Sequence, residues 1–367
     1  MPSSCRVLVL NERDPAHPSA GGAEIHLAEI FGRLAARGYE ITLAASRFRG
    51  AASRERLAGL DVRRLGRLPA YYPRVAWTTA KETRRGRYDV VVECLNKLPF
   101  YAPVYSAAPV LALCHHLFGE VAFQQVAWPI AATVWTAERL IPPLYRSVPF
   151  VTISPSSRDD LIARGISAER VQVIRCGTRR PELAIDTDKP RPLRVAYLGR
   201  LEPYKRVDVM LRAMARLRQR FPDLEVLVIG RGSARSDLER LARELDLDVR
   251  FVGFVPDQQR DALLASTRVC VCPSLKEGWG LTVIESNAAG VPVVASDAPG
   301  LRDSVRHAET GFLVAEADLD GFALRIAELL ADDELAVRMS RAARAWAEGF
   351  DWDDAAGEMA EALEEAR

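Results

Sequence analysis

The sequence predicts an α/β protein with two doubly wound parallel-sheet domains. Short runs rich in Val and Leu alternate with amphipathic stretches along nearly the whole chain, a pattern typical of parallel strands covered on both faces. The alternation breaks once, at the polar, proline-bearing segment 186–192, and then restarts. A length of 367 residues fits two domains of ordinary size. We therefore expect a first domain at residues 1–187, a second at 188–348 and a C-terminal helix at 349–367.

The individual elements follow this alternation in chain order. Apolar runs in the first domain predict strands at residues 6–10, 41–45, 62–65, 89–94, 110–114, 151–154 and 171–174. Amphipathic stretches at 24–36 and 156–164 predict helices between them. In the second domain we expect strands at 193–199, 225–230, 249–252, 269–273 and 293–296, and helices at 205–220, 236–245, 257–265 and 280–289. Three closing helices are expected at 318–331, 334–348 and 352–365.

Composition excludes several classes of protein. The formal net charge of +1 gives no global field for nucleic acid, so no nucleic-acid partner is expected. The first apolar run is too short for a signal peptide, and no run of about 18 apolar residues predicts a membrane-spanning helix. The six cysteines form no CxxC pair and lack zinc-ligand spacing, so we interpret them as reduced core thiols. These features predict a cytoplasmic location.

Two cations follow the first strand of the second domain. Arg200 leaves the strand end, and Lys205 is expected to open the next helix. In open parallel sheets, ligands bind outside the carboxyl ends of strands. A guanidinium fork and an ammonium beside the free N–H groups of a helix suit a diphosphate. On spacing alone, solvated basic residues on a loop remain the alternative.

A second candidate segment, residues 277–285, follows the strand expected at 269–273. Its glycines allow a ligand to approach the backbone closely. Glu285, in the first turns of a helix, can accept hydrogen bonds from a cis-diol such as a ribose, and Glu277 in the loop can bind a sugar hydroxyl or stabilise positive charge at an anomeric carbon. The alternative for Glu285 is that it only favours the helix N-terminus, by about 0.3–1 kcal/mol.

These two segments resemble the retaining GT-B glycosyltransferases of glycosyltransferase family 4, also called glycosyl transferases group 1. Residues 277–285 match the EX7E motif, and residues 199–208 resemble the GRL-x-x-x-K-x-x-D segment of that family. The segments 289–296 and 311–314 also look like family signatures. The resemblance implies a GT-B fold, in which two Rossmann-like domains face each other across a cleft and the C-terminal helix returns to the first domain.

The resemblance also implies roles for particular residues. Arg200 and Lys205 match the pair that grips the donor diphosphate, Glu285 the carboxylate on the ribose, and Glu277 the one that faces the transferred sugar. Further donor-binding positions match at Gly230, Phe254, Val255, Gly278, Trp279, Gly280 and Leu281.

In the first domain, Gly22 falls in a glycine pair that opens a helix and resembles the family loop whose amides reach the donor phosphate or the acceptor. His115, rather than its neighbour His116, is assigned to the family histidine that hydrogen-bonds the donor sugar. By themselves the glycine pair could be a plain turn, and a lone histidine at a strand end is usually structural.

The resemblance implies a hexosyl- or glycosyltransferase (EC 2.4.-.-) that moves a sugar from a nucleotide diphosphate donor to a sugar or lipid-linked acceptor with retention of configuration, in polysaccharide or glycolipid biosynthesis. No DxD motif lies in a suitable loop, so no metal or other cofactor is expected. Arginines between residues 47 and 87, and the apolar segment 123–145, suit an anionic membrane surface. Peripheral contact with the inner membrane face and a solvated basic face are both open.

Two rival functions remain. A nucleotide-sugar epimerase of the same shape would not usually have the EX7E pair, and a non-catalytic binder of sugar nucleotides would usually be exported. An NAD-dependent oxidoreductase is disfavoured because the segment 230–235 lacks the third glycine of the dinucleotide fingerprint.

Overall fold

The computed structural model describes residues 5–96, 98–119, 123 and 127–367. The chain forms two compact units, one made of Met1–Gly177 with Trp352–Arg367 and one made of Thr178–Asp351. The first unit thus ends before the expected position 187, because the following segment is bound by the second unit: Arg179 pairs with Asp261, and the Ile185 carbonyl accepts a hydrogen bond from Arg344.

The first unit contains an eight-stranded sheet with the order β3-β4-β2-β1-β5-β6-β7-β8. Its neighbouring strands are parallel except for the β3–β4 pair, and Val7 of β1 lies between Ile41 of β2 and Val90 of β5. The strands are β1 (Arg6–Leu10), β2 (Glu40–Ala45), β3 (Arg54–Leu57), β4 (Leu60–Arg64), β5 (Val90–Leu95), β6 (Val110–Cys114), β7 (Phe150–Thr152) and β8 (Val171–Val173).

Strand β3 was not among the expected strands. It is an edge strand of exposed, charged residues, joined to β4 by a tight turn at Ala58 and Gly59, which both have positive φ. Two positive φ values are typical of the type I′ turn that joins antiparallel strands. An exposed edge has no apolar run, so hydrophobic patterning missed it.

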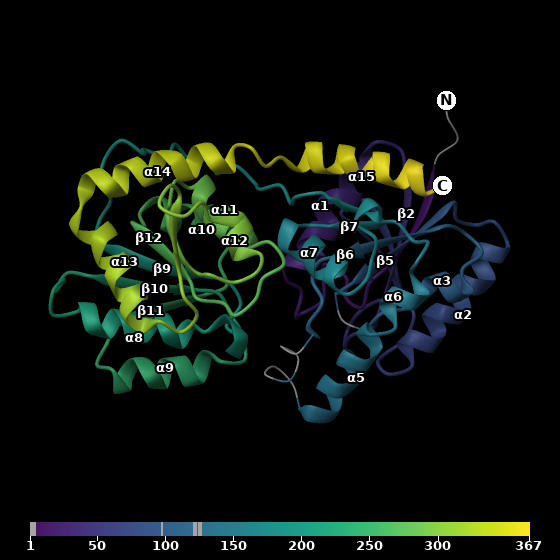
Figure 1. The fold of residues 1–367 in the computed structure, drawn as a ribbon, viewed down its shortest axis with the longest axis horizontal. Helices are drawn as coiled ribbons and strands as arrows, with labels where there is room; N and C mark the ends of the chain where they lie inside the picture. The colour runs from purple at the N-terminus through teal and green to yellow at the C-terminus, as the bar shows by residue number, and fades with distance from the viewer. Residues whose placement is uncertain (1–4, 97, 120–122, 124–126) are drawn as a thin grey trace. The chain divides into compact units, whose positions relative to one another are not determined.

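Helices cover both faces of the first sheet (Figure 1). On one face, Tyr71 and Val75 of α2 pack with Leu8, Leu10 and Val91 of the sheet. The helices are α1 (Gly22–Ala36), α2 (Tyr71–Arg84), α3 (Ala102–Tyr105), α5 (Trp128–Glu138), α6 (Ile141–Leu144), α7 (Pro155–Ala163), the 3-10 turn η2 (Ala168–Arg170) and α15 (Trp352–Ala366).

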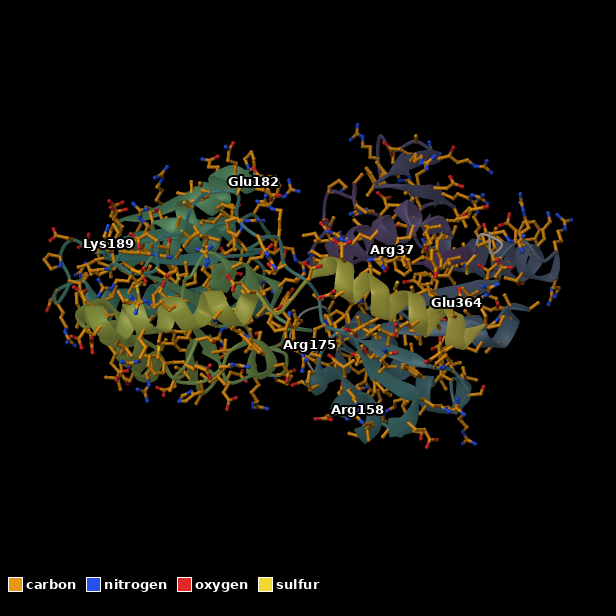
Figure 2. The ribbon with its side chains drawn as sticks, turned by 90° about the horizontal axis from the view of Figure 1, so that it is seen from above. Arg37, Arg158, Arg175, Glu182, Lys189 and Glu364 are labelled. Carbon is orange, nitrogen blue, oxygen red and sulfur yellow. The ribbon has the colours of Figure 1, made fainter. Side chains whose placement is uncertain are left out.

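The C-terminal helix α15 belongs to the first unit, where it packs against α1 and contacts β6. Arg37, directly after α1, donates a hydrogen bond of 2.8 Å to the Asp353 carbonyl in the first turn of α15. Figure 2 labels Arg37 and Glu364, the latter near the end of α15. The last helix of the chain therefore completes the covering of the sheet formed by the first 177 residues.

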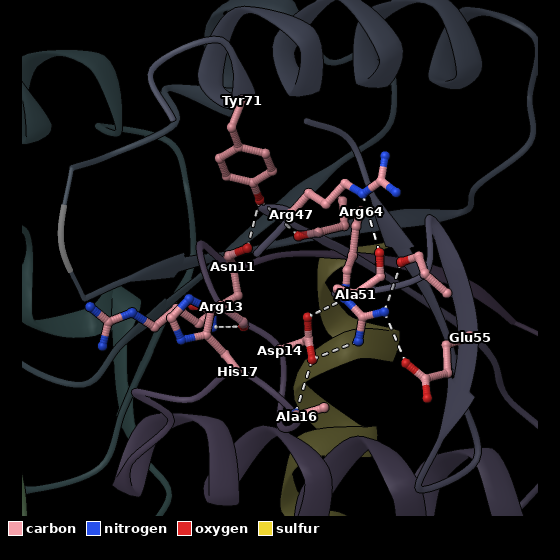
Figure 3. Close-up of polar contacts among 12 residues, drawn as sticks. Asn11, Arg13, Asp14, Ala16, His17, Arg47, Ala51, Glu55, Arg64 and Tyr71 are labelled. Atoms are coloured by element: carbon pink, nitrogen blue, oxygen red, sulfur yellow. Dashed lines mark hydrogen bonds and ion pairs between the residues drawn. The ribbon is translucent and has the colours of Figure 1, made fainter. Parts of the chain in front are cut away.

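A buried polar network fixes the loop between β1 and α1 (Figure 3). Asp14 and Arg64 have fully buried side chains and form a two-pronged ion pair at 2.7 and 3.0 Å. The Tyr71 hydroxyl donates toward the carbonyls of Asn11 and Ala44, at 2.6 and 2.8 Å. Since buried charges are stable only when paired, these contacts anchor the loop that leads to the glycine pair.

The second unit contains a six-stranded sheet with the order β11-β10-β9-β12-β13-β14, all parallel. Val195 of the central strand β9 lies between Val226 of β10 and Val269 of β12. The strands are β9 (Arg194–Leu198), β10 (Glu225–Ile229), β11 (Val249–Gly253), β12 (Val269–Cys272), β13 (Val293–Ser296) and β14 (Gly311–Val314). The sixth strand, β14, consists of residues 311–314, for which the sequence indicated only a resemblance to a family signature and not a strand.

Helices also cover both faces of the second sheet. Met210 of α8 and Phe322 of α13 pack on the face that presents Val195, whereas Val283 of α11 packs on the face that presents Ala196. The helices are η3 (Pro203–Lys205, a 3-10 turn), α8 (Val207–Leu217), α9 (Arg235–Glu244), α10 (Asp257–Ala265), α11 (Leu281–Ala288), α12 (Leu301–Ser304), α13 (Leu319–Ala331) and α14 (Asp333–Ala347). Each unit is thus a sheet between helical layers, parallel throughout in the second unit and parallel except for the β3–β4 pair in the first.

Candidate active site

Backbone hydrogen bonds join the loops at the carboxyl ends of three neighbouring strands of the second unit. The Gly199 N–H donates to the Ile229 carbonyl, and the Leu201 N–H to the Arg231 carbonyl, at 3.0 and 2.9 Å. The Gly230 N–H in turn donates to the Gly253 carbonyl at 2.9 Å. The loops after β9, β10 and β11 are therefore one connected surface rather than three independent turns.

Gly230 is required by this close approach. A Cβ at residue 230 would lie 1.8 Å from the Gly199 carbonyl oxygen, and the φ of Gly230 is +141°. Gly232 is equally crowded, since a Cβ there would lie 2.2 Å from the Leu201 carbonyl oxygen. The glycine-containing turn thus shapes the backbone beneath Arg200.

Arg200 and Lys205 are linked through the residue between them, Tyr204. The Arg200 guanidinium donates a 2.7 Å hydrogen bond to the Tyr204 hydroxyl, and the Lys205 ammonium lies 5.2 Å from the centre of the Tyr204 ring. The sequence predicted that Lys205 opens the helix, and this prediction is wrong. Lys205 ends the 3-10 turn η3, and α8 begins two residues later, at Val207. The intervening Arg206 has a φ of +51°, a left-handed conformation that sequence patterning does not reveal.

Glu277 forms an ion pair with Lys205. Burial is the largest single influence on the pKa of Lys205 and lowers it, but the charge and hydrogen bond of Glu277, together with Tyr204 and Cys272, more than offset burial, so the pKa is raised. Lys205 is therefore a positive charge at neutral pH, held where the loop after β12 meets the loop after β9. The Leu275 N–H, which donates to the Tyr204 carbonyl at 3.0 Å, ties the same two loops together.

The loop from Glu277 to Gly280 is packed tightly against its neighbours. The Glu277 N–H donates to the Pro299 carbonyl at 3.2 Å, and a Cβ on Gly300 would lie 2.3 Å from the Glu277 carbonyl oxygen. Trp279 is buried, and its ring meets Phe350 edge to face at 5.2 Å. Trp279 therefore contributes packing, and only its backbone is suited to contact a donor.

Three more predicted positions complete this loop and the helix that follows it. Gly278 lies between Glu277 and the buried Trp279. Gly280 precedes α11 with a φ of +87°, which favours glycine, and Leu281 is the first residue of the helix. The N-terminus of α11 thus follows directly on the Glu277 loop.

Glu285 lies in the second turn of α11 and contacts a different set of residues. Its Oε1 atom is 3.4 Å from Nη1 of Arg260 on α10. Burial raises the pKa of Glu285, and the positive charge of Arg260 partly counteracts this. The structure thus pairs Lys205 with Glu277 directly and links Arg200 to Lys205 through Tyr204, whereas the contacts of Glu285 run to α10.

Phe254, directly after β11, is an exposed aromatic residue. Its side chain is 73% exposed, and the Arg231 guanidinium lies 5.1 Å from the ring centre. Val255 beside it is half-buried and packs against the core of the second unit. An aromatic face next to a cation suits a planar, electron-rich ring such as a nucleobase.

In the first unit, Gly22 is the first residue of α1. The Glu24 carboxylate accepts a 2.7 Å hydrogen bond from the Gly21 N–H, which closes the helix start on its own backbone. Gly22 itself is exposed. The first N–H groups of a helix have no partner within it, so this end is available for an anion.

His115 is buried at the end of β6 and contacts a residue that the sequence did not single out. Its Nε2 lies 3.2 Å from Nδ1 of His26 on α1, and Trp352 of α15 lies beside His26 at 5.8 Å. Burial lowers the pKa of His115 to about 4, and burial with the neighbouring imidazole lowers the pKa of His26 well below its ordinary value. Both rings are neutral at pH 7, and within the part of the chain that the structure describes Nδ1 of His115 and Nε2 of His26 are buried without a hydrogen-bond partner.

Sequence patterning thus missed three residues in direct contact with predicted positions, namely Tyr204, Arg260 and His26. Tyr204 stands next to Lys205 in the chain, so proximity was a usable signal. Arg260 occupies the polar side of a helix and resembles an ordinary solvated residue. Among the described residues, no group of three or more His, Cys, Asp or Glu side chains could hold a metal ion.

Comparison with known proteins gives the family. The model of "Glycosyltransferase Family 4" matches residues 20–180, and that of "Glycosyl transferases group 1" matches residues 179–346. The chain is 28% identical to a GDP-mannose-dependent alpha-(1-6)-phosphatidylinositol monomannoside mannosyltransferase of Mycolicibacterium smegmatis, over 94% of this chain and 95% of that protein. It is 38% identical to a D-inositol 3-phosphate glycosyltransferase of Mycolicibacterium paratuberculosis, over 54% of this chain and 45% of that relative.

Solved structures show the same fold. A sucrose-phosphate synthase of Thermosynechococcus elongatus superposes with a TM-score of 0.81 at 24% identity, over 98% of both chains. HepE of Anabaena, in complex with UDP-glucose, superposes with a TM-score of 0.76 at 21% identity, over 98% of this chain and 99% of that one. Because the two family models together span residues 20–346 and these folds match from end to end, the chain belongs to the GT-B glycosyltransferases of family 4.

Proposed function

We propose that this glycosyltransferase moves a sugar from a nucleotide diphosphate donor to an acceptor hydroxyl with retention of anomeric configuration. The bond between the anomeric carbon and the donor phosphate oxygen breaks, and a bond to the acceptor oxygen forms on the same face of the sugar. The acceptor proton passes to the leaving phosphate. Negative charge grows on that phosphate and positive charge on the anomeric carbon.

The contact between Lys205 and Glu277 supports this proposal most directly. It places a fixed cation and a carboxylate side by side at the carboxyl ends of β9 and β12, with Arg200 joined to them through Tyr204. Preorganised cations stabilise a leaving diphosphate without the cost of reorganising water. In this proposal the two cations take the role that a metal ion has in other transferases, and Glu277 faces the transferred sugar.

The remaining residues are assigned around the same donor. Glu285 holds the ribose hydroxyls, and Phe254 with Val255 meets the nucleobase. Gly230 shapes the turn below the nucleotide. The backbone of residues 278–281 lies along the sugar and the phosphates. In the first unit we assign Gly22 to contact with the donor phosphate or the acceptor, and His115 to a hydrogen bond with the donor sugar.

Enzyme assays separate this function from its rivals. A transferase releases nucleoside diphosphate only when an acceptor is present, whereas an epimerase or a non-catalytic binder shows no such dependence. Lys205→Ala and Glu277→Ala should each lower turnover sharply in a folded protein. Anomeric proton couplings of the product, measured by NMR, report retention or inversion. Normal transfer by either variant would count against the assigned roles.

The donor base can be found by thermal-shift measurements with UDP, GDP, ADP and TDP, because a ligand that binds the folded state raises the unfolding temperature. The relative from Mycolicibacterium smegmatis is named for GDP-mannose, and the HepE structure contains UDP-glucose. Both nucleotides are therefore the first to test.

We further propose a lipid-linked acceptor and peripheral contact with an anionic membrane at the cytoplasmic face. Trp77 of α2 and Trp128 of α5 are 65% and 72% exposed. The Lys81 ammonium lies over the Trp77 ring at 4.7 Å. Exposed tryptophans, one of them beside a cation, suit the headgroup region of an anionic bilayer. Of the apolar segment 123–145 on which this reading also rests, residues 124–126 lie outside the described residues.

Vesicle co-sedimentation tests the membrane proposal. Among the helices of the described residues, none is long and apolar enough to span a bilayer, so the proposal concerns surface contact only. We expect salt-sensitive binding to vesicles that contain phosphatidylglycerol, weaker binding to pure phosphatidylcholine, and a loss for the W77S/W128S double variant. Equal sedimentation of wild-type protein with and without vesicles would remove the proposal.

A further inference from the structure

Glu285 is a mostly buried carboxylate that contacts an arginine of a neighbouring helix. Its side chain is 22% exposed, and its Oε1 atom lies 3.4 Å from Nη1 of Arg260. The two residues lie on different helices, α11 and α10, which pack on the same face of the second sheet. The contact therefore depends on how Arg260 is held.

Arg260 is fixed by carboxylates of its own helix. Its Nη1 lies 3.0 Å from Oδ1 of Asp257, and its Nη2 lies 3.2 Å from Oδ1 of Asp261. Asp261 is buried and is itself bound by Arg179, whose Nη2 lies 2.6 Å from Oδ2. The guanidinium is thus held on two sides and directs one nitrogen at Glu285. These two contacts restrict the conformations of the Arg260 side chain.

We propose that Arg260 is a positioning residue for the donor nucleotide: it occupies Oε1 of Glu285 and so orients the carboxylate to accept the ribose hydroxyls through Oε2. This inference rests on the proposed function, in which Glu285 binds the ribose. It adds a residue from α10, outside the segments that resemble the family motifs, to the machinery of donor binding.

The charges around Glu285 make the proposal testable by pH. Burial raises the pKa of Glu285, Arg260 lowers it, Asp257 and Asp261 raise it, and Arg179 lowers it. Without Arg260, the nearest positive charge is gone while both aspartates remain. The pKa of Glu285 then rises further, and a protonated carboxyl group loses an acceptor for the ribose.

The test is calorimetric titration of the full chain with UDP and with GDP between pH 6 and pH 8. For Arg260→Met we expect affinity to fall as the pH is lowered from 8 to 6, because the raised pKa leaves a larger share of Glu285 protonated at the lower pH. Wild type should change much less over this range. R260K keeps the charge but not the fork, so its pH profile should follow wild type with a smaller, uniform loss of affinity.

Two further variants complete the design. Glu285→Gln cannot titrate, so its affinity should be low at both pH values. The matched control is Arg240→Met, which removes an arginine from the exposed 2.7 Å pair with Asp237 on α9 and should behave as wild type.

Three outcomes would overturn the inference. One is an R260M profile parallel to that of wild type. Another is a uniform loss in R260M that R260K does not relieve, which indicates a merely structural role. The third is nucleotide binding in E285Q equal to wild type. If wild type binds neither nucleotide, the proposed function falls with the inference, so the two failures are distinguishable. If R260M does not fold, Arg260→Gln, which also removes the charge, takes its place in the same titration.

Discussion

Replacing Lys205 by methionine should destabilise the second unit and abolish donor binding together. The substitution keeps an unbranched side chain of similar length and removes the charge. It leaves the Glu277 carboxylate, now without its cation, in the loop that meets Pro299 and Gly300. The change therefore isolates the ion pair from the packing of the aliphatic stem.

The size of the effect follows from how little water reaches the pair. The Lys205 and Glu277 side chains are 12% and 13% exposed. Removing one partner from a fully buried pair costs about 3–5 kcal/mol, and exposed pairs contribute about 0.2–1 kcal/mol. At this exposure we expect a loss of about 2–3 kcal/mol in the free energy of unfolding for K205M. The double variant K205M/E277Q removes both charges and should recover to within about 1 kcal/mol of wild type.

Urea unfolding of the four members of this double-mutant cycle, followed by circular dichroism, measures the coupling. The transition of the second unit should move, and that of the first should not. UDP or GDP should raise the stability of wild type only, because neither the single variants nor the double variant retains the pair. Unchanged stability in K205M, with additive effects in the double variant, would refute the reasoning that Glu277 depends on Lys205.

Three other substitutions probe the fold around the candidate residues. Gly230→Ala should cost about 2–4 kcal/mol in urea unfolding, because a Cβ would meet the neighbouring carbonyl at 1.8 Å; stability equal to wild type would contradict the close approach. Arg64→Met should lower the free energy of unfolding by about 3–5 kcal/mol, because it leaves the fully buried Asp14 carboxylate without its cation. A loss under about 1 kcal/mol would contradict this role of the ion pair. His115 has a pKa of about 4 when folded against about 6.5 when unfolded, so the native state binds fewer protons than the unfolded state between these values. The free energy of unfolding should therefore be at its full value above pH 7 and lower by about 2 kcal/mol at pH 5. The pH slope should shrink in His115→Gln and persist in the exposed control His307→Gln.

The sheets of both units were predictable because buried parallel strands consist of apolar runs. Strands β1 and β6 appear at the residues that the sequence predicts. Strand β3 escaped prediction because its residues are charged and exposed, and its pairing depends on two positive φ values at the turn. Apolar patterning reports burial, so it finds covered strands and overlooks exposed edges.

The candidate site was predictable only for residues in the segments that follow strands. The segments that follow β9 and β12 contain Arg200, Lys205 and Glu277, and parallel topology brings strand ends together. The start of α8 was misplaced because Arg206 adopts a left-handed conformation, which residue type alone does not reveal. The pairing of Arg260 with Glu285 joins residues 25 positions apart on two helices, so only the packing of those helices on the sheet shows it.

The segment 350–352 has one residue that packs beside a candidate residue of the second unit and one that packs in the first unit. The chain passes between the units after Gly177 and again after Asp351. The Phe350 carbonyl accepts a 3.1 Å hydrogen bond from the Thr178 N–H, so the two passages are tied together within the second unit.

The side chains on either side of Asp351 then serve different units. The Phe350 ring packs against Trp279 of the Glu277 loop, and two residues later Trp352 packs beside His26, which contacts His115. Two nearby positions of the chain thus take part in the packing behind a candidate site of their own unit, Phe350 in the second unit and Trp352 in the first.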